Sequence, residues 1–100
     1  MKRINVRYRL KAEHVQENEE LIQKVFRQLH ELNPPGIHYA IHKLADGVTF
    51  LHNALYETDG AHHLFTALSA FMDFQKSVKE RCDELPVVSN ATQIGAYSPR

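Results

Sequence analysis

The sequence contains no tryptophan, a single cysteine, and only four glycines and four prolines. One cysteine cannot form a disulfide within the chain, so a reducing, cytoplasmic compartment is the expected location. Neither sign of charge is in excess, because twelve basic residues balance twelve acidic ones. Nucleic-acid and anionic-membrane surfaces usually need a basic excess, so we expect neither partner.

Long apolar runs are also missing. No stretch approaches the ~18 residues of a membrane span, and residues 1–7 carry charges where a secretory signal needs an apolar segment. The 100 residues are 43% apolar, which is ordinary for a globular protein. This length predicts one domain covering residues 1–100.

In the first half of the chain, hydrophobic periodicity predicts a strand, a helix and a hairpin. Residues 3–10 alternate between apolar and polar side chains, as in a half-buried strand. In residues 13–32 the apolar side chains recur every three or four positions, which is helical spacing. Residues 37–57 are interpreted as a β-hairpin, because Asp46 and Gly47 form a strong tight-turn signal.

The second half predicts a helical segment and a last strand. Residues 61–82 are expected to be helical in two pieces, the second capped by Ser69. Cys82 falls on the apolar side of that second piece, where it is expected to be a small buried hydrophobe. The last strand is predicted over residues 87–97, with Gly95 marking a bulge.

The order strand, helix, hairpin, helix, strand is the ferredoxin-like β-α-β-β-α-β arrangement, an α+β fold with a four-stranded antiparallel sheet. Right-handed crossovers place both helices on one face of that sheet. The other face should be polar, yet the second hairpin arm carries Leu51 and Leu55 there. A sheet that is apolar on both faces needs two covers, so we expect a homodimer, sheet against sheet. Scattered surface leucines are the alternative.

The whole chain resembles the dimeric α/β-barrel superfamily, in particular the antibiotic-biosynthesis-monooxygenase-like domains. The segments that carry this resemblance are residues 21–26, 46–50, 56–60, 63–64 and 69–74. The resemblance implies a homodimer whose two sheets close a barrel, with a pocket between sheet and helices in each subunit. Known members include cofactor-independent quinone-forming oxygenases, haem-degrading enzymes, small isomerases and proteins without known activity.

The function that this resemblance implies is a cofactor-independent monooxygenase-like enzyme acting on a small aromatic or polyketide-like compound. The oxygenase and haem-degrading branches often place a tryptophan in the pocket, and this chain has none. Two alternatives therefore stay open: a non-catalytic small-ligand-binding or interaction homodimer, and a haem-binding or haem-degrading protein. Fold by itself does not decide among them.

Seven histidines are many for this length. His38 and His42 lie ~13 Å apart on one predicted hairpin arm, too far to share a metal ion directly. His62 and His63 are adjacent, so on a helix they diverge by ~100° and only one can face inward. No Cys-x-x-Cys motif and no helical His-x-x-x-His pair occurs, so we expect no metal site. A catalytic metal ion held by His52, His63 and Glu57 is the alternative.

His52 lies in the middle of the second hairpin arm, where its face depends on the hairpin register. A two-residue turn places it opposite Ile41, and a three-residue turn places it opposite Ala40. A neutral imidazole is a plausible general base, so His52 or His63 is the expected base. Asn53 stands where strands rarely carry asparagine, and its amide could hold an oxyanion.

The expected walls of a ligand pocket are aromatic. Tyr39, Tyr56, Phe71 and Phe74 could supply the flat apolar surfaces that a planar aromatic ligand needs. Ordinary core packing is the alternative for all four. Glu57, at the end of the predicted strand, is either a pocket acid or a surface residue.

Overall fold

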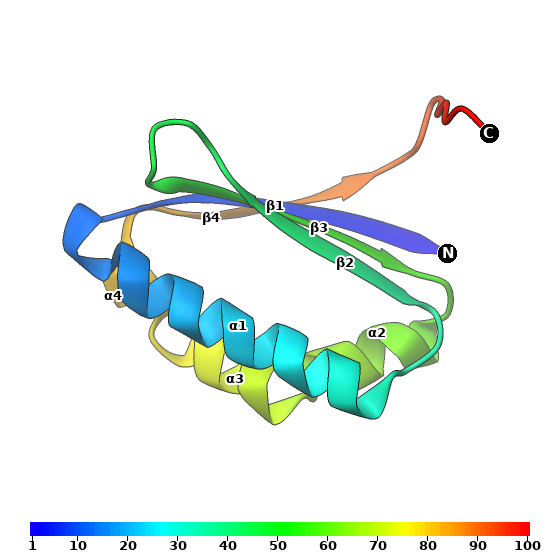
Figure 1. The fold of residues 1–100 in the computed structure, drawn as a ribbon, viewed down its shortest axis with the longest axis horizontal. Helices are drawn as coiled ribbons and strands as arrows, with labels where there is room; N and C mark the ends of the chain where they lie inside the picture. Colours follow the sequence, from blue (N-terminus) through cyan, green and yellow to red (C-terminus); the bar gives the residue numbers. More distant parts are fainter.

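Figure 1 shows the computed structural model, which describes residues 1–100 as a sheet with all helices on one side. The elements in chain order are β1 (Lys2–Leu10), the 3-10 helix η1 (Ala12–His14), α1 (Val15–Leu32), β2 (Ile37–Lys43), β3 (Thr49–Tyr56), α2 (Asp59–Thr66), α3 (Ser69–Lys76), α4 (Val78–Arg81) and β4 (Cys82–Ala91). The strand order is β2-β3-β1-β4, with every neighbouring pair antiparallel. The ferredoxin-like α+β fold predicted from the sequence is therefore confirmed.

Local backbone conformation and hydrogen bonds end α1 and close the loop of the hairpin. Asn33 ends α1 in the left-handed conformation, with φ of 47°, and its N–H donates to the carbonyl of Leu29. In the hairpin loop, the Asp46 carboxylate accepts hydrogen bonds from the backbone N–H groups of Val48 and Thr49. Gly47 takes φ of 77°, which a side chain would resist. These contacts close the loop and set the register of β2 on β3.

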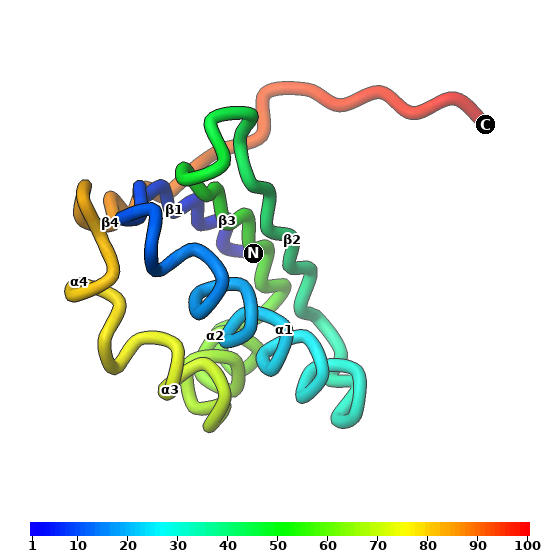
Figure 2. Tube along the Cα trace, turned by 60° about the vertical axis from the view of Figure 1, so that its left-hand side comes forward, coloured from blue at the N-terminus to red at the C-terminus, as the bar shows by residue number.

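The end of the chain differs from its prediction. The helical segment consists of three pieces rather than two, and β4 begins at Cys82 instead of residue 87. Pro86 is tolerated inside β4 because this is an edge strand, and the pairing with β1 shifts register between Arg7 and Arg9. Gly95 lies beyond the strand and marks no bulge. β4 ends at Ala91 rather than at residue 97, and the C-terminal end of the chain leads away from the sheet, as Figure 2 shows.

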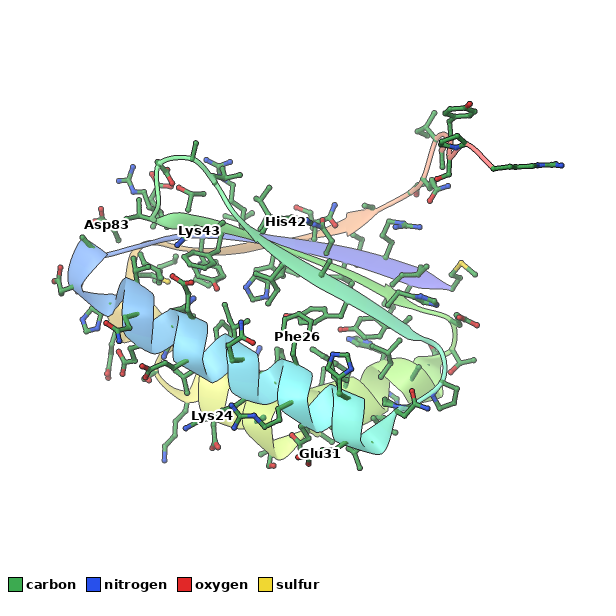
Figure 3. All side chains as sticks on the ribbon, in the orientation of Figure 1. Lys24, Phe26, Glu31, His42, Lys43 and Asp83 are labelled. Atoms are coloured by element: carbon green, nitrogen blue, oxygen red, sulfur yellow. The ribbon has the colours of Figure 1, made fainter.

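The hydrophobic core lies between the sheet and the helices. Its buried side chains include Tyr8, Leu10, Phe50, Phe65 and Phe74. In Figure 3, Phe26 points from α1 into this layer, whereas Lys24 and Glu31 lie on the outer side of the helix. The opposite face of the sheet has no helix over it (Figure 1). None of the helices combines the length and the apolar character that crossing a membrane requires.

Candidate functional site

The register of the hairpin decides where His52 lies. His52 pairs with Ile41 on β2 and with Val6 on β1, which is the register that a two-residue turn would impose. Cross-strand partners share a face, so His52 lies beneath the sheet, on the helix-covered side. His42 pairs with Leu51 and is exposed, so it does not share this face. His52 itself is only 5% exposed.

Two tyrosines hold the His52 ring from either side. The Tyr8 hydroxyl of β1 lies 2.7 Å from Nε2, and the Tyr39 hydroxyl of β2 lies 2.6 Å from Nδ1. Both ring nitrogens are therefore hydrogen-bonded, and the two contacts prevent the imidazole from rotating. A neutral imidazole has one donor and one acceptor nitrogen, so the two tyrosines must play different roles.

Burial sets the protonation states of these rings. It lowers the pKa of His52 to about 4, so the imidazole is neutral at pH 7. It also raises the pKa of Tyr8 and Tyr39 far above the ordinary value for tyrosine, and that of Tyr56 to about 12. All three phenols are therefore protonated at neutral pH. Around the His52 ring the site therefore holds uncharged hydrogen-bonding groups rather than ions.

A cavity of about 210 Å³ opens beside the His52 ring. Its walls are mostly apolar, and they include Val6, Phe65, Phe71 and Phe74. The rings of Phe65 and Phe71 are 4.6 Å apart between centroids. The polar groups that line the cavity include Tyr8, Tyr39, His52, Tyr56 and His62. The arrangement can hold a small apolar molecule that presents one polar atom to the tyrosine–histidine group.

The structure brings five of the sequence-predicted site residues together. Three elements, β2, β3 and α3, supply these residues, and all five line this one cavity: Tyr39, His52, Tyr56, Phe71 and Phe74. The aromatic side chains belong to the core as well as to the cavity wall, so the two interpretations offered by the sequence do not exclude each other.

Three predicted site residues lie elsewhere. Asn53 is exposed on the opposite face of the sheet, because neighbouring residues of a strand alternate in direction. His63 is exposed on α2, and its neighbour His62 lines the cavity instead. Glu57 is also exposed, and its Oε2 lies 2.7 Å from Nε2 of His38. The structure therefore does not bring Asn53 or His63 close to the His52 ring.

A buried polar chain, absent from the sequence-based prediction, extends the site into the core. The Asn18 amide of α1 donates from Nδ2 to the Tyr8 hydroxyl at 3.0 Å, and Arg81 of α4 donates from Nε to Asn18 Oδ1 at 3.1 Å. We call Arg81, Asn18, Tyr8, His52 and Tyr39 the polar chain. A sequence signal did exist, since Asn18 interrupts the apolar stripe of α1 at a helical spacing.

Arg81 is 1% exposed and forms no ion pair with a carboxylate. Its Nη1 donates to the Ser77 hydroxyl at 2.9 Å and its Nη2 to the Phe74 carbonyl at 2.8 Å. The guanidinium also lies 5.1 Å from the centre of the Phe74 ring. A buried cation is costly, and neutral acceptors and a ring face are all that offset the cost here.

Metal ligands do not converge anywhere in the chain. No group of three or more histidine, cysteine, aspartate or glutamate side chains is placed to hold a metal ion. Cys82 is buried at the start of β4 rather than on a helix, and burial raises the pKa of its thiol. A thiol of raised pKa in an apolar site is a poor nucleophile.

Comparison with solved structures identifies the fold. No protein-family model matches the sequence, and no curated protein is similar to it. A candidate antibiotic biosynthesis monooxygenase from Nitrosomonas europaea superposes with a TM-score of 0.79 at 15% identity, over 95% of this chain and 100% of that one. Rv0793 from Mycobacterium tuberculosis gives 0.79 at 13% identity, over 97% and 98%. A further candidate monooxygenase, from Deinococcus radiodurans, gives 0.74 at 16% identity, over 100% and 99%.

Proposed function

Because the chain has the fold of the antibiotic-biosynthesis-monooxygenase-like domains, we propose that it is a cofactor-independent monooxygenase-like enzyme for a small aromatic compound. One observation carries the proposal: an apolar cavity contains a neutral imidazole clamped between two phenols. Such a site can bind a flat apolar molecule and exchange a proton with it at one point.

The volume of the cavity limits the ligand. An engineered apolar cavity of roughly 150 Å³ accepts benzene, and pockets for drug-sized molecules occupy about 300–1,000 Å³. At about 210 Å³ this cavity lies between the two. We therefore expect a one- or two-ring substrate, and the haem alternative is disfavoured because a porphyrin is much larger.

The chemistry follows from the position of His52. A phenol bound beside Tyr39 gives up its hydroxyl proton toward the Tyr39–His52 pair when Nδ1 of His52 is unprotonated, which leaves an anion with part of its charge on a ring carbon. That carbon forms a bond with O₂, and a returning proton gives a hydroperoxide. Loss of water then leaves a quinone, so one phenol and one O₂ give one quinone and one water. The ring supplies the electrons and O₂ is the oxidant.

The pKa of His52 constrains this step without forbidding it. Moving a proton from a phenol, whose pKa is about 10, to a group of pKa about 4 is unfavourable by roughly 8 kcal/mol. A turnover of ~10 per second corresponds to a total barrier of roughly 16 kcal/mol. The transient transfer therefore fits within the barrier, and phenols with acidic hydroxyl groups are the favoured substrates.

The same pKa favours one alternative function. A histidine that is neutral at all pH values above about 4 is a weak base, so the cavity suits a ligand-binding protein that performs no reaction. In that case the Tyr39–His52 pair would orient the ligand by a hydrogen bond only.

The test is oxygen-dependent turnover of two-ring phenols. We expect the protein to consume O₂ and form a quinone absorbance from 1-naphthol or 1,5-dihydroxynaphthalene in air and not under nitrogen. His52→Asn should remove this activity, and His63→Asn discriminates between the two bases predicted from the sequence. Loss of turnover only in the His63 variant would overturn the role of His52. Ligand binding without O₂ consumption would establish the non-catalytic alternative.

We also propose that two copies pair through the face of the sheet that carries no helix. Leu51 and Leu55 lie on that face, and so does Val87, which is 63% exposed. A second sheet would cover these side chains. Sedimentation equilibrium should give twice the chain mass of 11.5 kDa, and Leu51→Glu should shift the protein to the monomer. A wild-type species of one chain mass at micromolar concentration would contradict the dimer.

A further inference from the structure

The buried Arg81 fixes the direction of every hydrogen bond in the polar chain. We propose that Arg81 and Asn18 are positioning residues that hold His52 in the tautomer protonated on Nδ1, so that the Tyr39 hydroxyl donates into the cavity and selects ligands with an acceptor oxygen. The inference rests on the proposed function only in taking the cavity as the ligand site. In this tautomer Nδ1 is already protonated, so transfer of a substrate proton through Tyr39 to His52 requires the less populated Nε2–H tautomer.

The first step concerns the Asn18 amide. A guanidinium has five N–H donors and no acceptor, so the Asn18 atom that faces Arg81 must be its oxygen. The other amide atom is then the nitrogen, which donates to the Tyr8 hydroxyl oxygen at 3.0 Å. Asn18 is 0% exposed, so no water can offer a different arrangement.

The second step concerns Tyr8. Its oxygen accepts from Asn18, and its own hydrogen needs an acceptor because the side chain is 2% exposed. His52 Nε2, at 2.7 Å, meets this need when it carries no proton. The proton of the neutral imidazole then lies on Nδ1, and it points to the Tyr39 oxygen at 2.6 Å.

The third step concerns Tyr39, the last residue of the polar chain. Its oxygen accepts from His52, so its hydroxyl hydrogen is free to point to a ligand in the cavity that Tyr39 lines. The opposite tautomer would leave the buried Tyr8 hydrogen without an acceptor, which disfavours it by roughly tenfold or more. Tyr56 and His62, the other polar rings of the cavity, form no hydrogen bond with the polar chain.

The free hydroxyl hydrogen of Tyr39 gives the cavity a preference for ligands that present an acceptor oxygen. A carbonyl, phenolate or enolate oxygen accepts this hydrogen bond, and an apolar molecule of the same shape does not. The preferred form of a phenolic substrate is then the anion that forms when its proton leaves, and a quinone product offers the same kind of oxygen. The chemistry that the site recognises is therefore an aromatic ring that carries an acceptor oxygen.

A single isosteric substitution reverses the direction of the hydrogen bonds in the polar chain. In Asn18→Asp, the carboxylate still accepts from Arg81, but its second oxygen also accepts, so the Tyr8 hydroxyl turns and donates to it. The Tyr8 oxygen then accepts from Nε2–H of His52, and the Tyr39 hydroxyl donates to Nδ1. The new carboxylate also gives Arg81 an ionic partner, which favours folding of the variant. Asn33→Asp is the matched control, because Asn33 is exposed at the end of the same helix and lines neither the cavity nor the helix-free face of the sheet.

The first measurement is the tautomer itself, read from the ¹⁵N chemical shifts of the His52 ring in ligand-free protein. We expect the Nδ1–H tautomer in the wild type and in Asn33→Asp, and the Nε2–H tautomer in Asn18→Asp. A merely structural role of Asn18 would change stability without exchanging the two nitrogen shifts. An Nε2–H tautomer in the wild type, or an unchanged tautomer in a folded Asn18→Asp protein, would overturn the proposal.

The second measurement compares two ligands of similar shape, acetophenone with its carbonyl and ethylbenzene without one. The ratio of their dissociation constants should change by roughly three- to tenfold between wild type and Asn18→Asp, the value of one hydrogen bond. Asn33→Asp should keep the wild-type ratio. An equal ratio in all three proteins would overturn the ligand selectivity. Failure to bind either probe would overturn the proposed function instead. The tautomers would still decide the direction of the hydrogen bonds in the polar chain.

Discussion

Acidification should destabilise the protein through His52 before its carboxylates are protonated. Burial lowers the pKa of this imidazole from 6.5 to about 4 in the folded state. The unfolded chain therefore binds a proton at higher pH than the folded protein does. Stability from the neutral, buried ring is fully present above pH 6.5 and is lost as the pH falls from 6.5 toward 4.

The size of this effect follows from the shift. A difference of 2.5 pKa units corresponds to about 3.4 kcal/mol of unfolding free energy when the titration is complete. At pH 5 the loss is about 2 kcal/mol, because this pH lies 1.5 units below the unfolded value. A domain of this size has a total stability of only roughly 5–15 kcal/mol, so the effect is large enough to measure.

Urea unfolding of the wild type and of His52→Gln at pH 7 and pH 5 isolates this contribution. Glutamine offers a donor and an acceptor but does not titrate, so the variant keeps every other pH-dependent group, including His62, whose pKa burial also lowers. The wild type should lose about 2 kcal/mol more than the variant between the two pH values. Equal losses in the two proteins would show that the imidazole is not held neutral, and the account of the site would be wrong.

Two further predictions test neighbouring contacts. Tyr8→Phe should lower the free energy of unfolding by about 2–4 kcal/mol, because Asn18 and His52 both lose a partner in the core. Tyr39→Phe should lower it by only about 1 kcal/mol, because water in the cavity can replace its hydroxyl. Denaturant titration of both variants tests this order, and a larger loss in Tyr39→Phe would refute it. Asn33→Ala should lower the stability by about 1 kcal/mol, because φ is 47° at this position, while Asn33→Gly should stay close to wild type. Thermal unfolding compares the three proteins. Equal midpoint temperatures for the alanine and glycine variants would argue against a backbone cause.

Secondary structure was predictable wherever one physical signal dominated. The apolar spacing of α1 and the alternation of β1 arise from local geometry, and both elements occur as predicted. The start of β4 was not predictable in the same way. Pro86 ordinarily argues against a strand interior, and only its position on an edge strand beside a register shift makes it acceptable. That information lies in the neighbouring strand rather than in the local sequence.

The features of the candidate site are likewise of two kinds, those that the local sequence predicts and those that depend on tertiary contacts. The amino-acid sequence by itself determined the ferredoxin-like fold, the aromatic character of the cavity wall and the importance of His52, because periodicity and residue type act over a few positions. Only the tertiary structure decided which face His52 takes, since the register depends on the closed geometry of the hairpin loop. It also separated Asn53 and His63 from the cavity, and it joined Arg81 to Asn18 across 63 positions of sequence. Such a contact forms only when α1 and α4 pack against the same sheet, and no local pattern encodes it.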